Sequence, residues 1–340
     1  MTAPPSAPAP TRPPIRLGDA LFGGLVRASA IFVVVLLIAV AAIFIKTAWP
    51  SITRFGLNFL VSSDWDSTKV PDNCLDAQGN ALTTAGCEPG AYGGLPYVIG
   101  TVITSIVSLT LATPLAVGAA IFISEYAPPR LGDIISFVVE MLVAIPSVVY
   151  GLWALAFVVP LLGDTGGVEN FLANTIGQVP VIGALFSNPL TNKDYFAASI
   201  ILTIMILPTI LAISREVVRQ VPQLQKAGMI ALGATKWEAI RLAVLPYARA
   251  GITGGAMLGL ARALGETLAV TMTIGNNPAI NSDPSLFNSG ITLASGIANR
   301  IGEANGLGFA AIIELGLLLL IVSTIINLLS RVLVSRTVRA

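Results

Sequence analysis

Histidine is absent from this 340-residue chain, and charged residues make up only 11% of it. Without histidine, the chain cannot form Ser-His or Cys-His catalytic pairs, histidine metal sites or histidine proton relays. A soluble domain carries roughly 25% charged residues because its surface faces water, so the composition excludes a cytosolic enzyme. The net charge of +1 provides no polyanion-binding signature and argues against nucleic acid as a partner.

What the chain has instead is apolar sequence, with 54% hydrophobic residues and a mean hydropathy of +0.82. A helix needs about 20 mostly apolar residues to cross a bilayer core, and the gaps between charged residues locate such runs. The predicted spans are 28–49, 97–123, 133–160, 197–213, 250–274 and 307–330. We therefore predict an all-α, polytopic membrane bundle of six helices, in which Pro146 kinks the third span.

The segment before the first span, residues 1–27, is rich in proline and is predicted to be a disordered tail. The first span follows Arg12, Arg16 and Arg27, which would also suit a secretory signal. The apolar run is longer than a usual signal core, and no clear small-residue cleavage site follows it. This favours an uncleaved transmembrane anchor over 28–49.

Lysine and arginine are unevenly distributed between the predicted loops, and this bias sets the orientation of a membrane protein. With the N-terminus inside, 13 of the 19 basic residues lie in inner segments and five in outer ones. We expect a plasma-membrane protein with both termini in the cytoplasm. It would have an outer loop at 50–96, a core of five spans at 97–330 and an inner tail at 331–340.

Two cysteines, Cys74 and Cys87, lie in the predicted outer loop. Disulfides persist in an oxidising outer compartment, and closing this loop would stabilise it by about 3 kcal/mol. The alternative is two free thiols. Two cysteines without histidine do not favour a metal site.

The loop of residues 215–249 holds six of the 13 inner basic residues, and its pattern describes two short helices. The first runs over 223–232 and stops at Gly233, a residue suited to a left-handed turn. Thr235 and Glu238 then fit a capping box, and the second helix is expected to end at Pro246.

Apolar residues on these otherwise polar helices favour a docking surface for another protein: Leu224, Ala227, Ala231 and Trp237. A loop lying on anionic lipid headgroups is the alternative. No lysine of the chain follows a glycine, so a phosphate-binding loop for ATP is excluded.

The segment 227–235, followed by Leu245 and Pro246, resembles the EAA loop of ABC importer permeases. Gly233 and the Leu-Pro pair are in register with that motif, and Gly228 is a small-residue substitute. Ala227 replaces the glutamate of the motif, which removes any salt bridge made there. The resemblance implies that the loop inserts into a groove of the ATPase. It assigns this coupling to Lys226, Ala227, Gly228, Gly233, Ala234, Thr235, Leu245 and Pro246.

Arg262 and Glu266 lie four residues apart within the fifth predicted span, on one helix face. A charge at the helix centre costs roughly 2.5–3.5 kcal/mol, so it needs a partner or a polar pathway. Two interpretations stay open: a salt bridge that neutralises both groups, or an anion site in which the guanidinium donates to an oxyanion. Small residues recur every four positions beside the pair and predict close helix packing: Gly251, Gly255, Gly259 and Ala263.

The segment 259–267 resembles the G-x-x-R-A-x-G-E-T stretch of phosphate ABC transporter permeases. The segment 144–151, together with Gly100-Thr101 and Ser105, is also similar to that family, and 63–66 is similar to one of its two permease paralogues. The resemblance implies a substrate pathway through Arg262, Glu266, Thr267 and Ser147.

From this resemblance we expect a non-catalytic permease subunit of an ATP-driven phosphate importer. Its expected partners are a paralogous permease, an ATPase dimer that holds ATP and Mg, and an external phosphate-binding protein. The chain itself is expected to bind membrane lipid and phosphate but no cofactor. The alternatives are a permease for another oxyanion or an amino acid, a secondary carrier and an assembly scaffold. The roles of Glu140 and Glu314 stay open.

Overall fold

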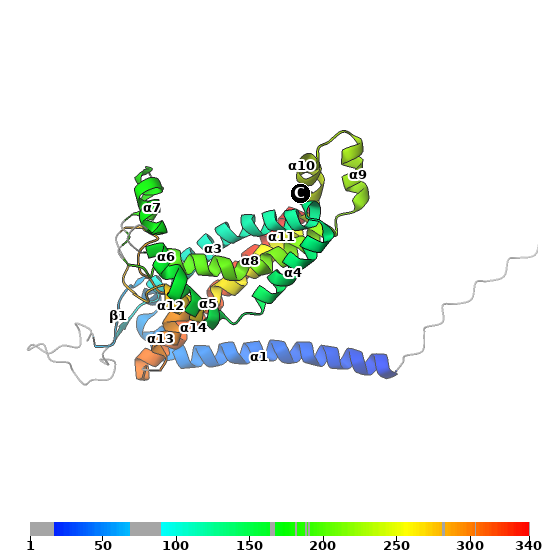
Figure 1. The fold of residues 1–340 in the computed structure, drawn as a ribbon. Helices are drawn as coiled ribbons and strands as arrows, with labels where there is room; N and C mark the ends of the chain where they lie inside the picture. The colour runs from blue at the N-terminus through cyan, green and yellow to red at the C-terminus, as the bar shows by residue number, and fades with distance from the viewer. Residues whose placement is uncertain are drawn as a thin grey trace, which may run out of the picture. The chain divides into compact units, whose positions relative to one another are not determined.

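The computed structural model describes residues 17–68, 90–163, 167–180, 182–187, 189, 191–280, 283–302 and 304–339. The chain divides into two compact units, residues 1–46 and 47–340. In the described part of the chain, every element longer than two residues is helical (Figure 1). This agrees with the predicted all-α membrane fold.

Helix α1 (Leu17–Phe55) begins within the segment that the sequence analysis assigned to a disordered tail. Residues 17–27 continue the apolar pattern of the first span and contain no proline, so the helix extends through them despite three glycines. The stretch Leu21–Phe55 is apolar on all sides, and large side chains such as Phe22 and Leu37 are exposed. A helix that is apolar all round needs lipid or another chain around it.

Four of the predicted spans are confirmed as helices. The span 28–49 lies within α1, and the others are α3 (Leu95–Ile121), α8 (Tyr195–Arg219) and α14 (Gly306–Arg339). By length and composition, the described residues hold five helical stretches able to cross a membrane. α14 continues through the predicted inner tail at 331–340, which is therefore helical as far as Arg339.

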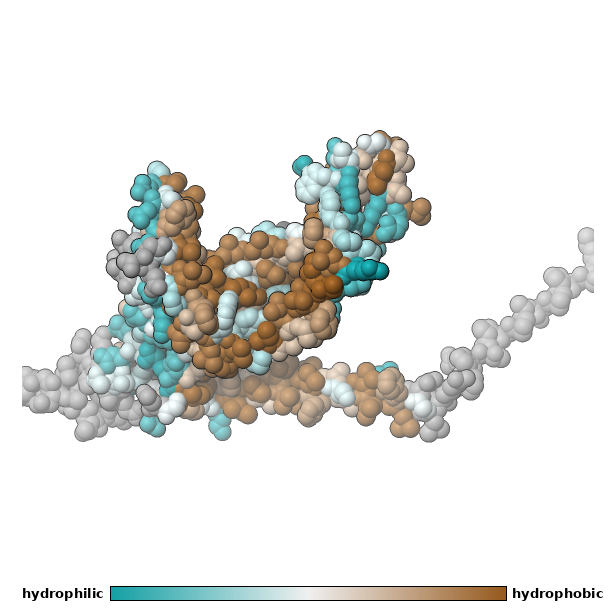
Figure 2. All heavy atoms as spheres, viewed as in Figure 1, coloured by the Kyte–Doolittle hydropathy of each residue, from teal (hydrophilic) through white to brown (hydrophobic). Residues whose placement is uncertain are grey.

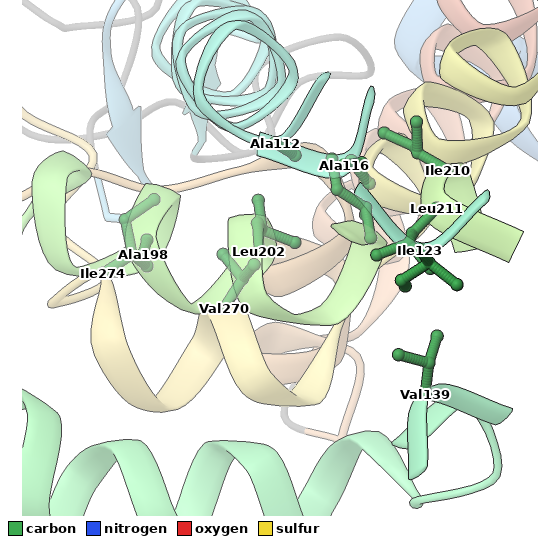
Figure 3. Packing of buried hydrophobic residues seen from close by; sticks show 12 residues of the cluster. Ala112, Ala116, Ile123, Val139, Ala198, Leu202, Ile210, Leu211, Val270 and Ile274 are labelled. Atoms are coloured by element: carbon green, nitrogen blue, oxygen red, sulfur yellow. The ribbon is translucent and has the colours of Figure 1, made fainter. Parts of the chain in front are cut away.

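Helix α8 is the centre of the bundle, with two thirds of its most apolar window buried. Its most extensive contact is with α3, which presents Ala112 and Ala116 so that the two backbones approach closely. Leu202 and Ile210 of α8 and Val270 of the later helix α12 belong to the same buried cluster (Figure 3).

The predicted third span, 133–160, is not one kinked helix. α4 (Pro129–Val143) ends before Pro146, and a new helical stretch starts at Ser147 with α5 (Ser147–Trp153). Pro146 adopts an extended conformation that the chain cannot include in a helix (φ −60°, ψ 141°). The π-helical turn η3 (Ala154–Val158) and α6 (Val159–Gly163) then continue the stretch.

The predicted fifth span, 250–274, is also divided. α11 (Leu245–Leu264) ends at Gly265, and the short helix α12 (Leu268–Thr273) follows Thr267. This region is absent from the five stretches identified by length and composition, because two arginines lower its hydropathy.

The inner loop folds as the sequence predicted up to its last turn. α9 (Gln223–Ala231) and α10 (Lys236–Ala239), residues 223–239 together, form a hairpin that projects from one end of the bundle (Figure 1). The predicted stop at Pro246 is wrong. The π-helical turn η6 (Ile240–Val244) joins α10 to α11 without a break, and the Leu245 N–H bonds to the Ile240 carbonyl.

We call the end of the bundle that carries residues 223–239 the hairpin end. The opposite end, called the strand end, carries α2 (Asn58–Val61), the two-residue strands β1 (Trp65–Asp66) and β2 (Ala91–Tyr92), and α13 (Leu293–Arg300). The 3₁₀ turns η4 (Ile176–Gln178) and η5 (Gly183–Phe186) follow α7 (Val168–Thr175) there. Hydrophobic residues cover the sides of the bundle, and hydrophilic ones gather at its two ends (Figure 2).

Candidate functional site

Arg262 lies in the last turn of α11, half-buried against α8. The small-residue stripe beside it brings the two helices together, as predicted. A Cβ added at Gly251 would come within 2.4 Å of the Val217 side chain, and one at Gly259 within 2.8 Å of Ile210. This close packing fixes the height of the guanidinium in the bundle, where Nη1 donates to the Thr209 hydroxyl over 3.4 Å.

A salt bridge between Arg262 and Glu266, one of the two interpretations left open by the sequence, is not present. Both residues lie in the described part of the chain and make no ion pair with each other. The reason is the helix end at Gly265, which removes the one-turn spacing of a continuous helix. The Glu266 carboxylate turns forward and accepts a hydrogen bond from the Ala269 N–H (3.3 Å), at the start of α12.

Arg262 therefore keeps its charge without a carboxylate partner among the described residues. A guanidinium has five N–H donors in a planar fork that matches an oxyanion. Of these, only Nη1 has a side-chain acceptor in the described structure, the neutral hydroxyl of Thr209. The arrangement favours the anion-site interpretation over a neutralising salt bridge.

The break between α4 and α5 lies next to the break between α11 and α12. α5 packs against α12 so tightly that a Cβ at Gly151 would come within 3.0 Å of the Ala269 backbone. The Tyr150 hydroxyl donates to the Leu142 carbonyl (2.8 Å), which lacks the usual α-helical donor because Pro146 has no N–H and which also accepts a longer bond from the Ile145 N–H (3.4 Å). The Arg262 charge acts on this hydroxyl as well. Two interrupted helices thus meet beside one cation.

Discontinuous helices are where membrane transporters place backbone groups for binding ions and polar substrates. The two remaining predicted pathway residues lie at these breaks. Ser147 opens α5 and is half-buried, and Thr267 precedes α12 and donates to the Gly265 carbonyl (3.3 Å). Near Pro146, the side chain that bonds to a freed backbone carbonyl is that of Tyr150.

Sequence reasoning missed Thr209 and the part played by Tyr150. Thr209 follows Pro208 inside an otherwise apolar span, which is an available signal. Tyr150 belongs to the segment 144–151, but only the tertiary fold shows that its hydroxyl reaches back to the preceding helix.

The hairpin forms a second candidate site, and its turn has the predicted geometry. Gly233 has a φ of +89°, which L-residues rarely adopt. The capping box is present, since the Glu238 N–H donates to the Thr235 hydroxyl (3.3 Å) and the Thr235 N–H to Glu238 Oε2 (2.7 Å). The Thr235 N–H lowers the pKa of the Glu238 carboxyl by hydrogen bonding to its charged form.

Large apolar side chains of the hairpin are exposed, with Leu224 and Leu232 at 87% and 86%. Trp237 is also exposed. Ala227, Gly228 and Thr235 lie on the open surface, and Ala234 is half-buried. Leu245 and Pro246 lie outside the hairpin, at the start of α11. An apolar surface at the tip of a projecting hairpin is suited to docking.

Lys226 differs from the other predicted coupling residues because its side chain is only 13% exposed. Its ammonium forms an ion pair with Glu125, which lies in the π-helical turn η2 (Phe122–Tyr126) at the end of α3.

The remaining residues discussed from the sequence, two glutamates and two cysteines, do not lie together in one site. Glu140 is exposed on α4, whereas Glu314 is buried in α14 beside Ser51. Cys74 and Cys87 lie outside the described residues, so the disulfide stays a prediction.

Comparison with known proteins identifies similar chains. A family model described as "Binding-protein-dependent transport system inner membrane component" matches residues 112–339. The chain is 39% identical over 318 residues to the phosphate transport system permease protein PstC of Pasteurella multocida, which covers 94% of this chain and 92% of that relative. It is 37% identical over 318 residues to the protein of the same name from Haemophilus influenzae, covering 94% and 93%.

A solved structure shares the fold. The methionine ABC transporter MetNI, in an inward-facing conformation, aligns with 71% of this chain and 94% of its own chain, with a TM-score of 0.50 and 18% identity. At this identity the likeness concerns the fold alone.

Proposed function

Since the chain belongs to the family of binding-protein-dependent transport system inner membrane components, we propose that it is the permease subunit of an ATP-driven phosphate importer. It is a multi-pass inner-membrane protein and does no covalent chemistry itself. Phosphate is proposed as the substrate because the chain is similar to phosphate permeases over nearly its whole length. The Arg262 guanidinium, half-buried without a carboxylate partner in the described chain, supports an oxyanion.

The substrate pathway in this proposal passes the two helix breaks. Arg262 supplies the main donor to phosphate, and the Ser147 and Thr267 hydroxyls line the same region. Glu266 is tied to α12 and does not neutralise the arginine. Its negative charge nearby limits how tightly phosphate is held, which a transported substrate requires because it must leave again.

The partners follow from the same family. A paralogous permease completes the pathway, an external phosphate-binding protein delivers the substrate at the strand end, and two ATPase copies lie at the hairpin end. ATP and Mg belong to those ATPase copies. The exposed Leu224, Leu232 and Trp237 of the hairpin are the side chains suited to an ATPase groove.

In the proposed cycle, ATP binding closes the ATPase pair and displaces the hairpin. The bundle then changes from inward- to outward-facing, so that released phosphate reaches Arg262. Hydrolysis returns the bundle and opens the site to the cytoplasm. In this orientation both termini and the hairpin are cytoplasmic, in agreement with the basic residues concentrated there.

Competition uptake tests the substrate. Cells that depend on this transporter take up labelled phosphate, and unlabelled phosphate, arsenate or sulfate is added in excess. We expect phosphate and arsenate to compete, because both are tetrahedral oxyanions that keep a proton near pH 7, and sulfate, which is fully deprotonated, to compete poorly. Uptake of sulfate without uptake of phosphate would overturn the assignment and leave another oxyanion importer. Phosphate uptake that persists without the ATPase subunits would indicate a secondary carrier.

A further inference from the structure

The ion pair between Glu125 and Lys226 joins two segments that are 101 residues apart in the chain. Glu125 lies in η2, the turn that continues α3, and Lys226 lies in α9 of the hairpin. The two side chains are only 12% and 13% exposed. The other ion pair at the hairpin end, Arg219 with Asp133, is 4.0 Å long and 42% and 73% exposed. Only the first pair is shielded from water, where a charge pair is little screened.

A second contact joins the same turn to the other helix of the hairpin. The Lys236 ammonium of α10 lies 4.4 Å from the centre of the Tyr126 ring, within the range of a cation–π interaction. Glu125 and Tyr126 are neighbours in sequence. One turn at the end of α3 therefore contacts both α9 and α10.

The backbone around these contacts is continuous. η2 extends α3 without interruption and closes with the Ala127 N–H bonded to the Phe122 carbonyl (2.9 Å). The foot of the hairpin is packed as well: Val218, Val221 and Ile240 form a buried cluster, against which Ile121 of α3 packs. A displacement of the hairpin is therefore resisted at its foot by apolar packing and above it by two polar contacts.

We propose that Glu125 and Tyr126 form a strut that carries the movement of the hairpin to helix α3. α3 in turn packs along α8, the helix that holds Thr209 beside Arg262. Lys226 and Lys236 are then positioning residues that face the permease itself, rather than residues of the surface that docks on the ATPase. This inference rests on the proposed function, because it needs an ATPase that moves the hairpin.

Charge reversal tests the strut in the complete transporter with all its partner subunits, reconstituted in liposomes. The variants are Glu125→Lys, Lys226→Glu and the two combined. The measurement is the number of labelled phosphate ions imported per ATP hydrolysed. Each single reversal places two like charges side by side in a shielded site, so it is expected to lower this ratio about tenfold. The double reversal restores the pair and is expected to return the ratio to within about twofold of the unaltered protein.

A merely structural role would lower the amount of assembled transporter and leave this ratio unchanged. Co-purification of the ATPase is therefore measured alongside and is expected to persist in all three variants. Glu125→Gln, which removes the charge without reversing it, provides a milder variant if a reversal prevents assembly. The exposed pair is the matched control: Asp133→Lys and Arg219→Asp should change the ratio less than about twofold.

The aromatic contact has its own matched pair of variants. Tyr126→Phe keeps the ring and should keep the ratio, whereas Tyr126→Ala removes the ring and should lower it. Single reversals with an unaltered ratio, or a double reversal no better than the singles, would overturn the strut. If the phosphate assignment itself were wrong, the unaltered transporter would import no phosphate at all. This outcome distinguishes a wrong substrate from a wrong strut.

Discussion

The surroundings of Arg262 bear on how the Arg262–Glu266 motif is interpreted. The spacing to Glu266 is compatible with both an internal salt bridge and an anion site. The helix end at Gly265 favours the anion site, because it turns the glutamate toward Ala269 and leaves the arginine with Thr209. A half-buried cation without a carboxylate partner in the described chain is costly in a membrane. In the proposed function, a transported anion would offset that cost.

Replacing Arg262 with glutamine is expected to lower phosphate uptake at least about tenfold while leaving assembly intact, because glutamine retains a donor group but no charge. The measurement is the initial rate of labelled phosphate uptake, with co-purification of the ATPase as the check on assembly. Arg300→Gln, at the strand end, is the matched control and should transport more than Arg262→Gln. Normal uptake by Arg262→Gln would remove Arg262 from the substrate pathway.

A second residue-scale prediction concerns Asp194, a fully buried carboxyl at the N-terminus of α8. Burial and the neighbouring charge of Glu169 raise its pKa from 3.8 to about 8. Between about pH 4 and about pH 8, the folded protein therefore keeps a proton on this carboxyl, whereas the unfolded chain has already lost it. By linkage, the free energy of unfolding falls as the pH rises from about 4 to about 8.

The thermal unfolding midpoint of the detergent-solubilised protein should accordingly be higher at about pH 5 than at about pH 8. Asp194→Asn should flatten this dependence. It keeps an oxygen that can accept from the Ala197 N–H, as Asp194 does now at 2.8 Å, and so preserves the helix cap. Asp133→Asn, at an exposed carboxyl, should leave the dependence unchanged. An unchanged pH slope in Asp194→Asn would show that this carboxyl does not carry it.

At the scale of elements, apolar periodicity and capping signals predicted what depends on local sequence. α3, α8 and α14 lie where the charge-free runs placed them, and the hairpin has its left-handed glycine and capping box. Apart from the early start of α1 at Leu17, the errors concern how a helix responds to a breaker. Pro146 breaks a helix that was expected to bend, whereas Pro246 is accommodated by the π-turn η6. Local sequence does not decide between these outcomes, since tertiary partners such as the Tyr150 hydroxyl satisfy the freed groups.

The turn of the hairpin supports a prediction at this scale. Gly233→Val forces an L-residue to a φ of +89°, which costs roughly 1–2 kcal/mol in left-handed backbone. No atom lies within 4 Å of the added Cβ, so the effect comes from the backbone and not from crowding. We expect the hairpin to change shape, with weaker co-purification of the ATPase and less stimulation of its activity.

Gly228→Val is the matched control for this prediction. Gly228 has the same open space around its Cβ position but lies in the regular helix α9. The Gly228→Val variant should retain most of the co-purification of the ATPase. Equal losses in both variants would mean that glycine matters on this surface for docking itself rather than for the turn.

At the scale of the whole molecule, the path of the chain and its hydropathy give different numbers of crossings. Five described stretches are apolar and long enough to span a membrane. α11 is not one of them, yet it leaves the hairpin end, packs along α8 and leads through α12 to the strand end (Figure 1). Its arginines are tolerated because the helix lies inside the bundle, against α8, α3 and α14. We therefore count α11 as the sixth crossing.

An even number of crossings places both termini on the same side of the membrane, and an odd number places them on opposite sides. Green fluorescent protein folds in the bacterial cytoplasm but not when it is exported unfolded, so it reports the side of a terminus. Fusions at residue 1 and at residue 340 should both be fluorescent if α11 crosses. A dark C-terminal fusion beside a bright N-terminal one would support five crossings. It would also leave the hairpin and α13 together on the cytoplasmic side, which would contradict the proposed delivery of phosphate at the strand end.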